Sequence, residues 1–208
     1  MKYFLFSVLC FLAGCASYYK GLTKNEVLNP CVEDTKPAKL NTTWYTASID
    51  VIGKHLSGLL VVKKMPDASY RLVFTNEAGA TFFDFKFQPD GSFQVVSVIT
   101  QLDKKPVIET LRKDFELMLG LPFNQPLRSW QHNSLKYAGV ERDGEKIYFI
   151  VNSDCASHGN LEIGSKRKRK VSVSLAGKEP AQPDSILITH YTFNMTIRLT
   201  KFDKDVDE

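Results

Sequence analysis

The chain of 208 residues contains little of what marks several common functional classes. Its longest apolar run, Tyr3 to Leu12, is about half as long as the ~20 residues that a membrane-spanning helix requires. Its four histidines are scattered, without the close spacing that is typical of metal ligands, so we predict no metal site. The net charge is only +4, and basic residues are not interleaved with aromatic residues over a long stretch, so nucleic-acid binding is not predicted either.

A recognisable catalytic pattern is also missing. Ser153, Asp154 and His158 lie close together in the chain, but a catalytic triad is defined by geometry and not by clustering. No nucleophile-elbow pattern surrounds Ser153. We therefore expect no catalytic residues, no cofactor and no enzymatic activity.

The first residues, MKYFLFSVLCFLAGCAS, have the organisation of a secretory signal, with Lys2 before the apolar run. The run ends in Leu12-Ala13-Gly14-Cys15, which resembles the bacterial lipobox, whose cysteine is acylated. We expect residues 1–14 to be removed and Cys15 to carry several acyl chains, palmitate among them, because one chain alone binds a membrane only marginally. Ala16 follows the cysteine in place of an acidic residue, which by enterobacterial sorting rules favours a lipid-anchored position on the outer membrane, facing the periplasm.

Residues 15–42 are polar and contain Pro30 and Pro37, so they are expected to form the lipidated cysteine and a tether, with a short helix within residues 22–28. A domain would follow at residues 43–202, and residues 203–208 would be an acidic tail. Cys31 and Cys155 remain in a compartment that permits disulfides. They could pair with each other; alternatively, both are small buried apolar residues.

Apolar and polar residues alternate with a period of two through most of the domain, as expected for half-buried strands. In residues 81–88 three phenylalanines share one face, and in residues 193–200 four apolar side chains do so. Turn signals such as Asn76 to Gly79, Pro89-Asp90-Gly91 and Asp143-Gly144 separate these runs and favour short hairpins. The pattern predicts roughly ten strands, mostly antiparallel.

One segment has helical spacing instead. From Pro106 to Leu119, four apolar residues (Val107, Leu111, Phe115 and Met118) recur every three or four positions. Pro106 suits a first helical turn and Gly120 suits the position after the last one. A second short helical turn is expected around Gln125 to Gln131.

A wide antiparallel sheet presents a long apolar face, and a single amphipathic helix offers only one apolar stripe to cover it. We therefore predict a mainly β (α+β) fold, in which the sheet closes into a barrel, folds into a sandwich or curls around the helix. A curved sheet with the helix across its mouth would leave a concavity able to bind acyl chains with few polar partners. The alternative is that the same aromatic side chains interdigitate as a full core.

The stretch YRLVFTNEAGATFFDFKFQPDG, followed by the helix and by LGLPFNQPLRSW, resembles the LolB family of outer-membrane lipoprotein receptors. That family has a similar hairpin, a "QPG"-like turn, a helix ending in "GMP" or "GLP" and an "LRQW"-like segment. The stretch PDSILITHYTFNMTIRLTKF also looks like the last two strands of the family. The order of these motifs, more than any one of them, carries the resemblance.

The resemblance implies a single open, strongly curved antiparallel sheet, a half-barrel of about eleven strands of the LolA and LolB superfamily, with a helix plugging its concave apolar side. It also implies a function: the protein accepts acylated lipoproteins from a LolA-like periplasmic carrier and places them among outer-membrane lipids, working as a monomer. It implies an apolar ligand cavity on the inner face of the sheet and helix. The residues that we expect there are Tyr70, Leu72, Phe74, Phe83, Phe85, Phe87, Phe93, Val95, Leu111, Phe115, Met118, Phe193, Met195, Ile197 and Leu199.

One turn departs from the family pattern. The family carries a protruding apolar residue, usually Leu, in a turn that contacts the membrane, and here that turn is Asn76-Glu77-Ala78-Gly79. Ala78 and Gly79 would form the membrane-contact loop with far less apolar area than a leucine offers. Either another segment, such as Leu121-Pro122-Phe123, makes the contact, or the protein is an envelope lipoprotein that binds another lipid or a protein partner without inserting it.

Five consecutive basic residues, Lys166 to Lys170, form the densest charge of one sign in the chain. Such a block is typical of a solvated hairpin or a strand edge protected by charge. The functional alternative is contact with anionic lipid headgroups or with an acidic surface of a carrier.

Overall fold

The computed structural model describes residues 18–25, 27, 40, 42–51, 53–153, 159–178 and 182–202. The predicted signal segment, Cys15, Cys31, Asp154, Cys155, His158 and the acidic tail lie outside the described residues. Within the described part of the chain, no helix is both long enough and apolar enough to cross a membrane.

One antiparallel sheet of 13 strands contains nearly all of the regular structure, in the order β1-β7-β8-β9-β10-β11-β12-β13-β2-β3-β4-β5-β6. The strands are β1 (Thr23–Asn25), β2 (Thr43–Val51), β3 (Lys54–Lys64), β4 (Tyr70–Thr75), β5 (Thr81–Phe87), β6 (Phe93–Val98), β7 (Arg128–His132), β8 (Leu135–Arg142), β9 (Glu145–Asn152), β10 (Asn160–Gly164), β11 (Arg169–Ala176), β12 (Ser185–His190) and β13 (Met195–Lys201).

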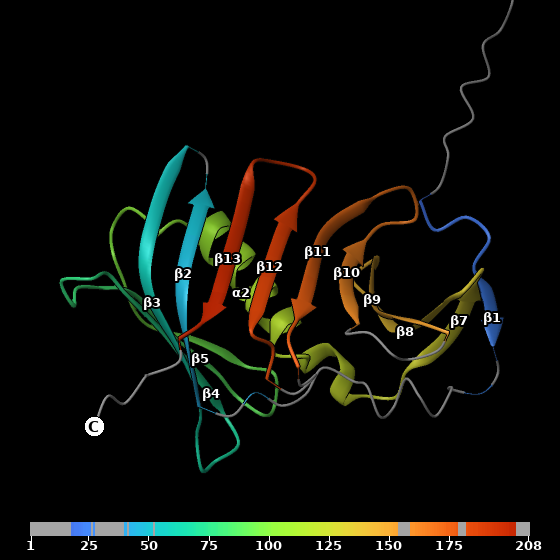
Figure 1. Ribbon diagram of the computed structural model, residues 1–208, viewed down its shortest axis with the longest axis horizontal. Helices are drawn as coiled ribbons and strands as arrows, with labels where there is room; N and C mark the ends of the chain where they lie inside the picture. The colour runs from blue at the N-terminus through green and yellow to red at the C-terminus, as the bar shows by residue number, and fades with distance from the viewer. Residues whose placement is uncertain are drawn as a thin grey trace, which may run out of the picture.

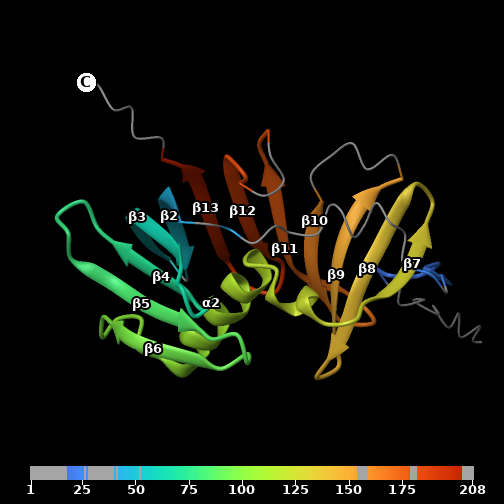
Figure 2. The same cartoon turned by 90° about the horizontal axis from the view of Figure 1, so that it is seen from below.

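The sheet is open and strongly curved, and the one α-helix, α2 (Lys105–Met118), lies on its concave side (Figures 1 and 2). A short 3₁₀ helix, η1 (Leu121–Asn124), continues from α2 on the same side. The expected half-barrel with a helix on its inner side is confirmed.

Alternation along most strands sends apolar side chains to the concave face, and the strand register aligns them across the sheet. One continuous row crosses seven strands: Ile49, Ile197, Ile188, Val173, Leu161, Phe149 and Ala138 are paired in this order. All seven are buried, because α2, η1 and the curvature of the sheet cover them. The core therefore lies between the sheet and the helix.

The helix has the expected bounds to within one residue. Pro106 occupies the first turn, where a missing N–H has no cost. Gly120 follows with φ of 68°, the left-handed conformation that ends helices and that glycine adopts most readily. This reversal directs the chain from α2 into η1.

Three expectations about local structure are wrong. The segment expected to be helical at Gln125 to Gln131 instead leads into β7, and the one within residues 22–28 contains β1, because β1 and β7 pair with each other at the edge of the sheet. Part of the predicted tether thus belongs to the sheet. The last strand begins at Met195 and not at Phe193, which lies in the β12–β13 turn.

Candidate functional site

The concave face brings together most of the side chains that the sequence assigned to a ligand cavity. Phe93 and Val95 on the edge strand β6 are half-buried, and Phe193 is 41% exposed. The other twelve are buried: Tyr70, Leu72, Phe74, Phe83, Phe85, Phe87, Leu111, Phe115, Met118, Met195, Ile197 and Leu199. Their contact with a ligand remains a prediction.

The centre of the concave side is filled by aromatic packing. Phe83 stacks on Phe85 with ring centroids 4.5 Å apart, and it contacts Phe74 at 5.4 Å. Phe115 of α2 lies 5.6 Å from Phe83, so the helix inserts an aromatic ring into this cluster. The expected hollow is therefore not continuous, because bulky residues on the helix stripe fill its middle, and two of the remaining cavities lie at the two ends of α2.

A small apolar cavity of about 200 Å³ lies at the N-terminal end of α2. Its lining residues are Val51, Pro106, Val107, Thr110, Phe193 and Met195. Phe193 and Met195 were among the expected cavity residues, whereas Val51 was missed. The alternation of Tyr45, Ala47, Ile49 and Val51 along β2 is the signal that could have found it.

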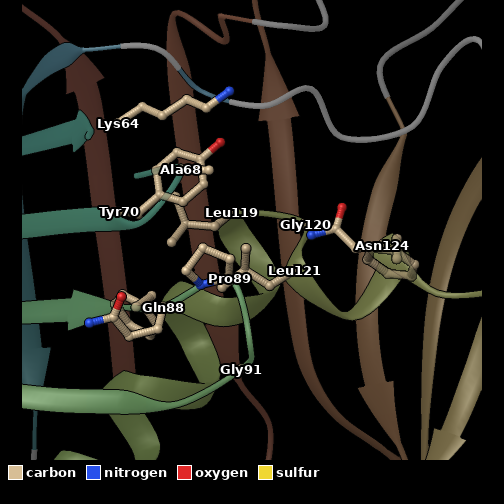
Figure 3. A pocket seen from close by; sticks show the side chains of 12 residues that line it. Lys64, Ala68, Tyr70, Gln88, Pro89, Gly91, Leu119, Gly120, Leu121 and Asn124 are labelled. Carbon is tan, nitrogen blue, oxygen red and sulfur yellow. The ribbon is translucent and has the colours of Figure 1, made fainter. Parts of the chain in front are cut away.

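A larger cavity of about 450 Å³ lies at the C-terminal end of α2 (Figure 3). Tyr70, Pro89, Leu119 and Leu121 gather around it, so its inner wall is largely apolar. Lys64, Gln88 and Asn124 also line it and give its mouth a polar character. Two of the expected residues, Tyr70 and Phe87, contribute to this cavity.

A buried polar contact ties α2 to the sheet. His190 Nε2 of β12 lies 2.9 Å from Asp114 Oδ2, and the two side chains are 4% and 0% exposed. Burial raises the pKa of Asp114, while the contact with His190 acts in the opposite direction. The second carboxylate oxygen, Oδ1, has no hydrogen-bond partner among the described residues.

Two further acidic residues connect the outer side of α2 to neighbouring strands. Glu145 of β9 accepts hydrogen bonds from Lys113 at 2.9 Å and from Lys170 at 2.6 Å. Burial alone would raise the pKa of Glu145, but these two lysines outweigh it and the pKa is lowered. Glu116 accepts hydrogen bonds from Arg112 at 2.8 Å and from Arg142 at 3.0 Å.

The predicted membrane-contact loop is a tight, exposed turn between β4 and β5. Asn76 N–H donates to the carbonyl of Ala80 at 2.9 Å, and Gly79 has φ of 81°. Ala78 and Gly79 are both exposed, and no large apolar side chain stands beside them in the turn. The alternative segment is not available as a protruding loop, because Pro122 and Phe123 are buried in η1.

Comparisons with known proteins give only distant likenesses. No family model matches the chain, and no curated protein matches it. A solved structure from Vibrio parahaemolyticus, named as an outer membrane lipoprotein-sorting protein domain, is similar with 10% identity and a TM-score of 0.41, covering 84% of this chain and 89% of that one. A DUF1329 family protein from Desulfovibrio piger is similar with 9% identity and a TM-score of 0.33, covering 85% and 90%.

Proposed function

We propose that this protein is a lipoprotein of the outer membrane that accepts acylated proteins from a LolA-like periplasmic carrier and places them in the bilayer. The observation that carries the proposal is the apolar concave face, open at both ends of the helix that covers it. The lipobox-like Leu12 to Cys15 and the LolB-like order of motifs from Tyr70 to Trp130 support the same role. No covalent chemistry is part of this proposal.

Transfer of an acyl chain between apolar environments needs no source of free energy other than the difference between their affinities for the chain. Each buried CH₂ group contributes about 0.8 kcal/mol, so a chain that leaves one cavity must enter another or a bilayer. A shallow, partly open cavity binds the chain less completely than a membrane does. The bilayer would therefore act as the final acceptor.

The cavities restrict how a ligand could enter. Pockets for drug-sized ligands typically measure about 300–1,000 Å³, and the apolar cavity beside Val107 has only about 200 Å³. A long acyl chain would therefore enter as α2 moves away from β13 and extends this space toward Phe115. The helix acts as a displaceable plug in this proposal.

The test is binding of a fluorescent fatty acid to the mature chain carrying Cys15→Ser. Val107→Trp places a ring in the apolar cavity, and displacing two methylene groups should weaken binding by about tenfold or more. Ile108→Trp is the matched control, because Ile108 is also half-buried on α2 but lines neither cavity, and it should change affinity less than about twofold. Absence of probe binding to the unsubstituted chain would overturn the proposed function.

The exposed turn at Ala78 favours a second function, an envelope lipoprotein that holds another lipid or a protein partner without insertion. A leucine in this turn would offer the membrane an isobutyl group, whereas Ala78 offers a methyl group. Transfer of an acylated protein from a purified carrier to vesicles distinguishes the two functions. Probe binding without transfer would favour the second, and Ala78→Leu should then increase transfer.

A further inference from the structure

One end of the sheet combines several turns, the start of the described chain and a basic and aromatic surface. The β10–β11, β12–β13 and β2–β3 turns all lie at this end, as the antiparallel order of these strands requires. The first described residue also lies there, because Tyr18 N–H donates to the carbonyl of Arg167 in the β10–β11 turn at 3.2 Å. In Figure 1 the blue N-terminal segment begins beside this turn.

The N-terminal segment is firmly fastened at this point. The Tyr19 hydroxyl donates to Glu162 Oε2 at 3.1 Å, and Arg169 Nη1 donates to Glu162 Oε1 at 2.9 Å. Tyr19 is 8% exposed, and its ring lies over Gly164, where a Cβ atom would come within 2.4 Å of it. These contacts fix the position from which the preceding residues leave the domain.

The distance from this point to the proposed lipid anchor is short. Two residues, Ala16 and Ser17, separate Tyr18 from Cys15, and the three residue-to-residue steps between them span at most about 10 Å. Acyl chains on Cys15 would therefore hold the β10–β11 turn close to the headgroups of the membrane that they enter. This geometry leaves the domain little freedom to present its opposite end.

The surface at this end has the composition of a membrane interface. Lys166, Arg167 and Lys168 are exposed in the β10–β11 turn. In the adjacent β12–β13 turn, Tyr191 is 48% exposed and Phe193 is 41% exposed. Aromatic side chains are favoured at headgroup depth, and basic side chains are attracted to anionic lipids.

We infer that the β10–β11 and β12–β13 turns form a docking surface for a bilayer that carries anionic phospholipid headgroups. Arg167 and its basic neighbours contact the headgroups, and Tyr191 and Phe193 lie at the interface. Phe193 also lines the apolar cavity, so docking places that cavity against the bilayer. The inference rests on the proposed function for its membrane, and it adds which end of the domain faces that membrane.

The test is sedimentation of the mature Cys15→Ser chain with vesicles of 30% phosphatidylglycerol and 70% phosphatidylcholine. Arg167→Glu with Lys168→Glu should weaken binding by about twentyfold or more, because each basic residue near such a surface contributes about fivefold. The matched control is Lys63→Glu with Lys178→Glu, which makes the same change in net charge on exposed residues at the opposite end. Equal losses in the two variants, or no binding of the unsubstituted chain, would overturn the inference.

A second measurement reports orientation directly. The tryptophan fluorescence that Phe193→Trp adds should be quenched by brominated lipid in the same vesicles. The fluorescence of the native Trp44, which is 45% exposed at the opposite end, should not be quenched. Quenching confined to Trp44 would overturn the inference. The charge-reversed protein should bind the fatty-acid probe as tightly as the unsubstituted chain, so failure of docking and failure of the proposed function give different results.

Discussion

The buried contact between Asp114 and His190 leads to a prediction about stability. Replacing His190 with leucine leaves the carboxylate of Asp114 buried and unpaired, since its Oδ1 atom already has no partner among the described residues. Removing one member of a buried ion pair typically costs about 3–5 kcal/mol. Solvent screening does not reduce this figure, because the two side chains are 4% and 0% exposed. We expect His190→Leu to lower the free energy of unfolding by about 3–5 kcal/mol at pH 7.

The double variant Asp114→Leu with His190→Leu separates the ion pair from simple loss of packing. An apolar pair of similar volume removes the desolvation cost, so the double variant should unfold within about 1 kcal/mol of the unsubstituted protein. Lys113→Met is the control on the same helix. The Lys113 side chain, which contacts Glu145, is 47% exposed, so the loss in the free energy of unfolding should stay below about 1 kcal/mol. Urea unfolding followed by tryptophan fluorescence measures all four proteins.

The pH dependence of His190→Leu provides an independent check. Burial raises the pKa of Asp114 in the folded protein above the unfolded value of about 3.9, and the contact with His190 opposes this rise, so His190→Leu should raise the pKa further. Folded His190→Leu then binds the proton more tightly than the unsubstituted folded protein, so the stability defect is present at neutral pH and shrinks as the pH falls toward the unfolded value. A loss below 1 kcal/mol in His190→Leu, or a double variant as unstable as His190→Leu, would refute the reasoning.

Two further predictions concern the ends of the sheet. Gly164→Ala should displace the ring of Tyr19, because the added Cβ would lie 2.4 Å from it; limited proteolysis should then cut near residue 18 faster, and unchanged cleavage would contradict the contact. Glu145 has a lowered pKa, so its lysine contacts stabilise the fold above the unfolded value of about 4.3 and are lost as the pH falls through the folded value. Glu145→Gln should therefore reduce the fall in the free energy of unfolding at acidic pH. An equal fall in both proteins would show that these contacts contribute nothing.

Local patterns predicted the fold because the sheet is built from strands that each carry their own signal. The alternation in β5 predicts that Phe83, Phe85 and Phe87 share one face, and all three rings are buried in the structure. The helix was predictable for the same reason, since its apolar stripe, Pro106 and Gly120 are all local features. The short strands β1 and β7 were not, because their pairing joins residues that are more than 100 positions apart.

The candidate site was predictable only in part, for reasons of distance and size. Phe193 and Met195 alternate visibly with their neighbours, but the contact of His190 with Asp114 joins residues 76 positions apart, and no local pattern marks it. The filled centre could not be predicted from the sequence either. Periodicity predicts which way Phe83 and Phe115 face, but not the volume that the curved sheet encloses. Composition left a filled core and a hollow as equal alternatives, and the family resemblance then favoured a larger hollow than the one observed.

The restraints on α2 differ in kind, and the difference bears on whether the helix can act as a plug. Phe115 is held by apolar packing, which strengthens with every contact that closure makes. Asp114 is held by its contact with His190, and the attraction in this contact is largely offset by desolvation of the buried carboxyl group, so the contact fixes the register of the helix more than it stabilises the closed state. An apolar residue at position 114 would tighten closure and should slow entry of an acyl chain into the cavity beside Val107. The double variant at positions 114 and 190 is therefore expected to be stable and yet to bind a fatty acid more slowly, which stopped-flow fluorescence would detect.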